Sequence, residues 1–130
     1  MIVDVGCGKG RSINWFLERF PANRIVGIEL DPDICAGTAR RIRHHANVTI
    51  ACGDATELLP PDGTIFYLFN PFDESVMRRF ARAMLDRNAP ATIVYLNAKH
   101  LSSFAEDPRF TVRPVEQPGL SFRSVLVTVA

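Results

Sequence analysis

The stretch VDVGCGKG, residues Val3–Gly10, decides the fold because it joins two apolar runs through three alternating glycines. The run Ile2–Val5 is strand-like, whereas Arg11–Phe20 carries its apolar residues at helical spacing. Glycine adopts positive φ and lets a ligand approach the backbone. The helix that follows offers free backbone N–H groups and the positive end of its dipole. The stretch therefore predicts a strand, a ligand-binding turn and a helix.

The spacing of the glycines separates two classes of ligand. The dinucleotide fingerprint is G-x-G-x-x-G. Counted from Gly6, its third glycine falls on Arg11, and counted from Gly8 it falls on Ile13. This mismatch disfavours a nicotinamide-dependent oxidoreductase. The observed pattern is instead D-x-G-x-G-x-G, which begins at Asp4. A turn without a ligand is also disfavoured, because each glycine costs backbone entropy.

Strand-like and helix-like runs alternate along the rest of the chain, which is the pattern of a parallel sheet with crossover helices. The exception is the C-terminus, where two strand patterns joined through Gln117-Pro-Gly119 predict a β-hairpin. We expect an α/β fold: a doubly wound, mostly parallel seven-stranded sheet with an antiparallel C-terminal hairpin and helices on both faces. The predicted strands cover 2–5, 24–30, 48–52, 64–69, 91–96, 110–115 and 121–129, and the predicted helices 11–20, 31–46, 73–87 and 101–105.

Length and composition place the chain among ordinary globular domains. With 130 residues, 47% hydrophobic and 22% charged, it is expected to form a single domain over 1–130 and is not disordered. Lys+Arg number 15 and Asp+Glu 14, so the net charge of +1 disfavours a nonspecific nucleic-acid binder.

The cysteines and the apolar runs bear on location. Three cysteines (Cys7, Cys35 and Cys52) without a C-x-x-C pair favour a reducing compartment over a disulfide framework or a zinc knuckle. Apolar runs stay well short of the ~18 residues of a membrane span, and the N-terminus lacks a signal-peptide pattern. We therefore expect a cytoplasmic protein without membrane association and without a metal site.

Two acidic residues stand where predicted parallel strands end. Glu29 ends the second strand, beside the glycine turn, and its carboxylate can accept hydrogen bonds from both hydroxyls of a ribose. Asp54 follows the third strand within Gly53-Asp-Ala55 and can accept from the exocyclic amine of adenine. The alternative for Asp54 is an ordinary Asx turn, and for Glu29 a solvated acid at a strand end.

These strand ends resemble, in this order, the class I S-adenosylmethionine-dependent methyltransferases. The matching segments are VDVGCGKG, GIELD (Gly27–Asp31), GDA (Gly53–Ala55) and LFNPF (Leu68–Phe72). The resemblance implies S-adenosyl-L-methionine as cofactor. By the same resemblance, Glu29 would bind the ribose and Asp54 the adenine amine, while Leu30 and Ala55 would flank the two faces of the adenine ring. The residues implied for the methionine portion are Asp4, Gly6, Gly8 and Gly10.

The segment Asn70-Pro71-Phe72 resembles the (N/D)-P-P-(Y/F) motif of amino-group methyltransferases, with Phe72 in place of the second proline. In that family the Asn oxygen and the next backbone carbonyl accept from the target amine, and an aromatic ring stabilises the developing charge. The resemblance makes these three residues the candidate catalytic group and an amine one candidate acceptor. The alternative is a loop that leads into the helix beginning near Asp73.

The main hypothesis is therefore a methyltransferase acting on an unidentified acceptor: a protein, a small molecule or a nucleic acid. The alternative is a non-catalytic methyltransferase-fold subunit that needs a partner. The chain has no counterpart of the segment that usually precedes the first strand in this family. We accordingly expect a site that is either open or completed by a larger molecule or another subunit, which would be a second copy in a homodimer or a partner subunit.

Overall fold

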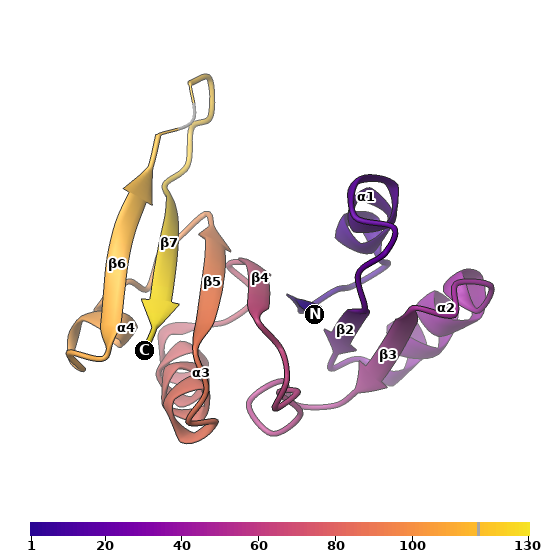
Figure 1. Ribbon diagram of the computed structural model, residues 1–130, viewed down its shortest axis with the longest axis horizontal. Coiled ribbons are helices and arrows are strands. Elements are labelled where there is room, and N and C mark those ends of the chain that lie inside the picture. Colours follow the sequence, from indigo (N-terminus) through magenta and orange to yellow (C-terminus); the bar gives the residue numbers. More distant parts are fainter. Residues whose placement is uncertain (117) are drawn as a thin grey trace.

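A computed structural model describes residues 1–116 and 118–130, so Gln117 of the predicted hairpin lies outside the described residues. One sheet carries helices on both faces (Figure 1). Its elements, in chain order, are β1 (Ile2–Val5), α1 (Arg11–Arg19), β2 (Ile25–Glu29), α2 (Pro32–Ile42), β3 (Val48–Cys52), β4 (Ile65–Phe69), α3 (Glu74–Asp86), β5 (Ala91–Leu96), α4 (Ser102–Ala105), β6 (Phe110–Val115) and β7 (Ser124–Val129).

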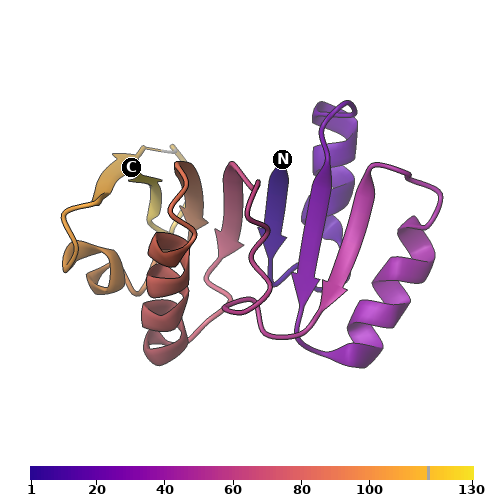
Figure 2. The same cartoon turned by 60° about the horizontal axis from the view of Figure 1, so that its bottom comes forward.

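The strand order confirms the predicted doubly wound sheet. The seven strands lie in the order β3-β2-β1-β4-β5-β7-β6, and only β7 runs antiparallel to its neighbours β5 and β6. Figure 2 shows the arrowheads of β1 to β5 pointing to the same edge. The chain winds outward from β1 to β3 and then returns to β4 on the other side of β1. In open α/β sheets such a switch point opens a crevice at the carboxyl ends of the strands.

The alternation of side chains along each strand builds two hydrophobic clusters. The larger cluster includes Val3, Phe66 and Tyr95 from the sheet together with the inner face of α3. The smaller cluster packs Ile2 against Ile13 and other residues of α1. Successive residues of β1 thus serve opposite faces, as the pleat of a strand requires. This central strand is buried on both sides and anchors the turn that follows it.

The helix starts agree with the sequence, whereas one helix end does not. Asp31 caps α2 by accepting from the backbone N–H groups of two residues in its first turn, at 2.9 and 3.0 Å. The predicted helix to Ala46 stops at Ile42. The reason is that the His45 N–H closes a tight turn onto Ile42, and the Asn47 side chain then bonds backbone carbonyls ahead of β2, at 2.8 and 3.2 Å.

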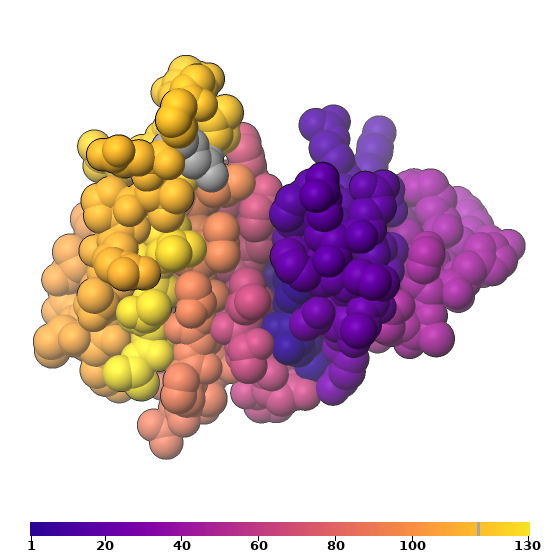
Figure 3. Space-filling view, turned by 45° about the horizontal axis from the view of Figure 1, so that its top comes forward, coloured from indigo at the N-terminus to yellow at the C-terminus, as the bar shows by residue number. Residues whose placement is uncertain are grey.

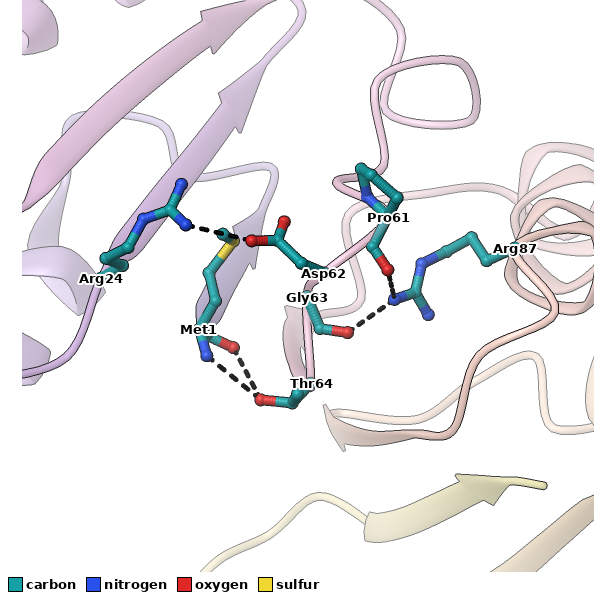
Figure 4. Close-up of polar contacts among 7 residues, drawn as sticks. All are labelled: Met1, Arg24, Pro61, Asp62, Gly63, Thr64 and Arg87. Atoms are coloured by element: carbon teal, nitrogen blue, oxygen red, sulfur yellow. Dashed lines mark hydrogen bonds and ion pairs between the residues drawn. The ribbon is translucent and has the colours of Figure 1, made fainter.

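One arginine holds the amino edge of the sheet. The Arg87 guanidinium donates to the carbonyl oxygens of Pro60, Pro61 and Gly63 at 3.1, 3.0 and 2.6 Å, and Figure 4 shows two of these contacts. The same group lies 4.6 Å from the centre of the Phe66 ring, a cation–π contact. Burial lowers the pKa of Arg87. The connection between β3 and β4 is thereby tied to the end of α3.

Further polar contacts at this edge join the first strands to the same connection. Arg24 pairs with Asp62 at 3.0 Å, and Thr64 Oγ1 contacts both the amino group and the carbonyl oxygen of Met1 (Figure 4). Because Arg24 and Asp62 are largely exposed, their ion pair adds little stability on its own. Its geometric effect is to align the starts of β1, β2 and β4.

One face of the sheet is hollowed beside α1. A hollow of about 850 Å³ lies between α1 and the strands β4 and β5, and Figure 3 shows it next to the indigo part of the chain. Trp15, Phe20 and Ile65 line it and keep 50%, 42% and 39% of their surface exposed. These exposed apolar side chains make the hollow a candidate contact surface for another molecule. Within residues 1–116 and 118–130, helices are too short or too polar to cross a bilayer.

The cysteine pairing corrects the sequence analysis. Cys35 in the first turn of α2 and Cys52 at the end of β3 form a disulfide, with their Cα atoms 5.8 Å apart. The prediction of reduced cysteines is thus wrong. The crossover from β2 to β3 brings the start of α2 back over the end of β3, which a spacing of 17 residues does not reveal. Cys7 is free and buried.

We predict that reduction lowers the free energy of unfolding by up to about 3 kcal/mol, the usual effect of a cross-link that closes a loop of this length. Urea unfolding with and without dithiothreitol measures the difference. Cys52→Ser should show the lower stability and no response to dithiothreitol. A thiol titration of the unfolded, unreduced protein should find one thiol; three would contradict the pairing.

Candidate active site

Four loops meet at the carboxyl edge of the sheet. They follow β1, β2, β3 and β4, which are neighbours around the switch point. All the sequence-predicted site residues lie in these loops or at the strand ends beneath them. The structure thus places the predicted site residues along one edge of the sheet. Their side chains differ in burial and in hydrogen-bond partners.

The glycine turn has the left-handed backbone that its sequence predicts. Gly6, Gly8 and Gly10 have φ values of 75°, 52° and 80°. A Cβ atom on Gly6 would stand 2.7 Å from Cβ of Pro71, so the loops after β1 and β4 touch there. A Cβ atom on Gly8 would meet nothing within 4 Å. Packing therefore explains the glycine at position 6, whereas the glycine at position 8 borders open space.

Glu29 holds the glycine turn against the second strand. Its Oε2 accepts from the Gly8 N–H at 2.8 Å, and its Oε1 accepts from the Asp31 N–H at 2.9 Å. From the other side the buried Thr38 hydroxyl donates to the Gly8 carbonyl at 2.8 Å. The carboxylate keeps further lone pairs for a ligand. Glu29 is thus both a structural clamp and an available acceptor.

Asp4 is the unusual carboxyl group of the site. It is 3% exposed, and its Oδ2 has no hydrogen-bond partner within the part of the chain that the structure describes. Burial and then the charge of Glu29 raise its pKa from 3.8 to about 7. A buried carboxyl group with an unpaired oxygen is costly, and a cationic ligand would relieve that cost.

Asp54 is more occupied than the sequence indicates. Its Oδ1 accepts from the backbone N–H and the hydroxyl of Thr56, both at 2.8 Å, and its Oδ2 pairs with Arg79 of α3. Hydrogen bonds from Thr56, and then Arg79, lower the pKa of Asp54. The Asx turn considered for this residue is therefore present. Arg79 is a contact that sequence reasoning missed, because no local pattern links α3 to this loop.

The two residues expected to flank an adenine differ sharply in exposure. Leu30 keeps 72% of its surface exposed at the end of β2. Ala55, by contrast, is 6% exposed and belongs to the larger hydrophobic cluster. Leu30 thus offers an exposed apolar side chain beside the site, while Ala55 contributes to the floor beneath it.

Asn70 is held by a residue that the sequence analysis did not single out. Its φ of 44° lies in the left-handed region, which asparagine tolerates better than most residues. The Tyr95 hydroxyl donates to Asn70 Oδ1 at 2.7 Å. The same hydroxyl oxygen accepts from the backbone N–H groups of Lys99 and His100, both at 3.3 Å. Tyr95 lies within the largely apolar strand β5, and no local pattern in the sequence links its hydroxyl to Asn70.

Phe72 is packed into the protein. Its ring lies 5.7 Å from that of Phe80 between centroids, and it contacts the larger hydrophobic cluster.

Within the described part of the chain, His, Cys, Asp and Glu side chains do not gather in threes as a metal site requires. The site therefore combines an unpaired carboxyl group, a glycine turn beside open space, and an amide held from behind.

Comparison with known proteins shows the family to which the chain belongs. A family model described as a methyltransferase domain matches residues 2–90. A trans-aconitate 2-methyltransferase from Sinorhizobium fredii (strain NBRC 101917 / NGR234) is 33% identical over 67 residues, which are 52% of this chain and 25% of the relative. The chain thus aligns with about a quarter of the length of that curated relative.

Solved structures share the fold. An RNA methyltransferase from Salinibacter ruber, crystallised with S-adenosyl-L-homocysteine, superposes with a TM-score of 0.73 at 22% identity, over 98% of this chain and 79% of that one. A SAM-dependent methyltransferase from Aquifex aeolicus gives 0.77 at 14% identity, over 99% and 81%. With a family model that spans most of its length and this sheet order, the chain belongs to the class I methyltransferases, the family whose cofactor is S-adenosylmethionine.

Proposed function

We propose that this chain binds S-adenosylmethionine at the carboxyl edge of β1–β4 and transfers its methyl group to an acceptor beside Asn70-Pro71-Phe72. The observation that carries the proposal is the buried Asp4 carboxyl group with an unpaired oxygen, close to a glycine turn that borders open space at Gly8. When bound, S-adenosylmethionine supplies an electrophilic methyl group on a positively charged sulfur. Its cationic methionine portion matches the unpaired carboxylate.

The site residues divide the cofactor between them. Asp4 and the turn of Gly6, Gly8 and Gly10 hold the methionine portion, with the carboxylate acting on the amino group directly or through water. Glu29 binds the ribose hydroxyls through the lone pairs that its two backbone contacts leave free. Asp54 binds the adenine amine, Leu30 covers one face of the ring, and Ala55 lies beneath the other. The chain's contribution to rate is then to orient the reactants and exclude water.

The acceptor binds next to the glycine turn, because the close approach of Gly6 to Pro71 sets the two loops side by side. The names of the relatives differ, one referring to trans-aconitate and another to RNA. The fold alone therefore leaves the acceptor open, and an amine is one class. The binding-only alternative has no observation in its favour over an active enzyme.

Two further expectations remain proposals. A homodimer or partner subunit would cover the hollow beside α1, and the exposed Trp15, Phe20 and Ile65 that line it support such a contact. A cytoplasmic location also remains a proposal. The cysteines no longer support this location, because Cys35 and Cys52 form a disulfide.

Gly8→Asp should abolish cofactor binding, because the new side chain would enter the open space and add a charge there. We expect the dissociation constant for S-adenosylhomocysteine to rise by more than about 30-fold, or ~2 kcal/mol. Calorimetric titration measures it. Gly119→Asp is the matched control, since Gly119 also has positive φ and open surroundings but lies in the C-terminal hairpin. Equal effects of the two substitutions would refute the assigned site.

Affinity for S-adenosylhomocysteine should rise about tenfold between pH 6 and pH 8, because the ionised Asp4 binds the amino group and its pKa is about 7. Asp4→Asn should bind weakly and with a flat pH profile over this range. An unchanged profile in that variant would assign the titration to another group.

The stability of the ligand-free chain should change with pH in the opposite direction. The folded chain holds the Asp4 proton more tightly than the unfolded chain, whose pKa is 3.8. The free energy of unfolding should therefore fall as pH rises from about 4 to about 7, by up to ~4 kcal/mol for a shift of about three pKa units. Asp4→Asn should lack this component in urea unfolding at both pH values.

A further inference from the structure

The hydrogen bonds of the Tyr95 hydroxyl determine which way the Asn70 amide faces. A tyrosine hydroxyl has one proton to donate and two lone pairs that accept. The backbone N–H groups of Lys99 and His100 occupy its accepting side, each at 3.3 Å. Its own proton is then left for Asn70, 2.7 Å away. Only the amide oxygen can accept that proton, so Oδ1 faces Tyr95 and Nδ2 points away from it.

The amide nitrogen is the polar atom of Asn70 that remains available. Tyr95 is fully buried, so the oxygen of Asn70 is directed toward the protein interior. Nδ2 makes no hydrogen bond to the residues that the structure describes, and it is not enclosed by them. Asn70 thus presents two N–H donors at the edge where the loop after β4 meets the glycine turn.

We propose, on the basis of the function proposed above, that Asn70 binds an oxygen acceptor, a carboxylate or a hydroxyl group, through Nδ2–H, with Tyr95 as a positioning residue. An oxygen has a lone pair to accept the hydrogen bond and another to attack the methyl carbon. As the new O–C bond forms, the S–C bond breaks and its electron pair stays on sulfur. A carboxylate becomes a neutral methyl ester without losing a proton; a hydroxyl group gives its proton to solvent and becomes a methyl ether.

An amine fits this arrangement poorly. A neutral amine has one lone pair, and the Nδ2–H donor would bind the lone pair that must attack. Its N–H groups would need acceptors, but one of the two lone pairs of Asn70 Oδ1 is used by Tyr95, and the oxygen is turned toward that residue. The position occupied by an accepting oxygen in the amino-group motif is therefore occupied here by a donor.

The test uses protein saturated with S-adenosylhomocysteine and three small probes: potassium acetate, phenol and methylammonium chloride. Proton–nitrogen correlation NMR follows the Asn70 side-chain NH₂ signals during each titration, with potassium chloride as the salt control. We expect saturable shifts with acetate, phenol or both, which distinguishes a carboxylate site from a hydroxyl site, and none with methylammonium. Saturable shifts with methylammonium alone, or no response to either oxygen probe, would overturn the proposal.

Two substitutions test the donor directly. Asn70→Asp keeps an oxygen for Tyr95 to bond but replaces the free NH₂ with an oxygen, so acetate affinity, followed here and in the control through the backbone N–H signals of the loop after β4, should fall at least about tenfold. Asn97→Asp is the matched control, because Asn97 also has left-handed φ (51°) and follows the neighbouring strand β5. It adds the same charge and should retain acetate binding. Equal losses in the two variants would reduce the effect to charge.

Tyr95→Phe separates positioning from folding. With the hydroxyl removed, the Asn70 side chain is free to rotate about its Cβ–Cγ bond, so its two NH₂ proton signals should shift toward those of a solvent-exposed asparagine while S-adenosylhomocysteine affinity stays within about twofold of wild type. Sharp, unshifted signals would show that Tyr95 does not set the amide. Failure of S-adenosylhomocysteine to bind the wild-type chain would reject the proposed function instead, and calorimetry detects that outcome before any probe is added.

Discussion

The whole carboxyl edge depends on the hydrogen bonds that Glu29 accepts from the backbone. By accepting from the N–H groups of Gly8 and Asp31, this one carboxylate joins the turn after β1 to the start of α2. Thr38 completes the attachment from α2. A turn of alternating glycines has many accessible conformations, and these contacts select one of them. The contacts with Glu29 and Thr38 hold the backbone of the turn, and no side chain fills the space beside Gly8.

The polar groups of this edge fall into two kinds, and the difference indicates where ligands belong. Both oxygens of Asp54 accept hydrogen bonds from Thr56 or Arg79, so this carboxylate is already satisfied within the protein although it keeps further lone pairs. Asp4 Oδ2 and Asn70 Nδ2 lack partners among the described residues. A ligand that bonds the buried Asp4 oxygen removes the cost of leaving it unpaired, and the accessible Asn70 nitrogen offers hydrogen-bond donors beside it. The two lie in loops that touch at Gly6 and Pro71.

Sequence reasoning succeeded for most properties that are local, although it extended the second helix to Ala46 where the structure ends it at Ile42. Strand and helix periods, the cap at Asp31 and the glycine turn each depend on a few consecutive residues, and the alternation of the elements indicates a mostly parallel sheet. It failed where residues far apart in the chain meet. The pairing of Cys35 with Cys52, the contact of Arg79 with Asp54 and the hydroxyl of Tyr95 behind Asn70 all span 17 to 25 residues. None of these contacts leaves a periodic signal.

The arginine at the opposite edge makes the sheet mechanically asymmetric. At the amino ends of the strands, one guanidinium bonds three carbonyl oxygens and stacks on Phe66, so any displacement there breaks several charge-assisted contacts together. At the carboxyl ends, the glycine turn is held by fewer contacts, those of Glu29 and Thr38 with Gly8. A ligand that closes on this edge can therefore tighten the loops without shifting the register of the strands below, and the entropy it costs is confined to those loops.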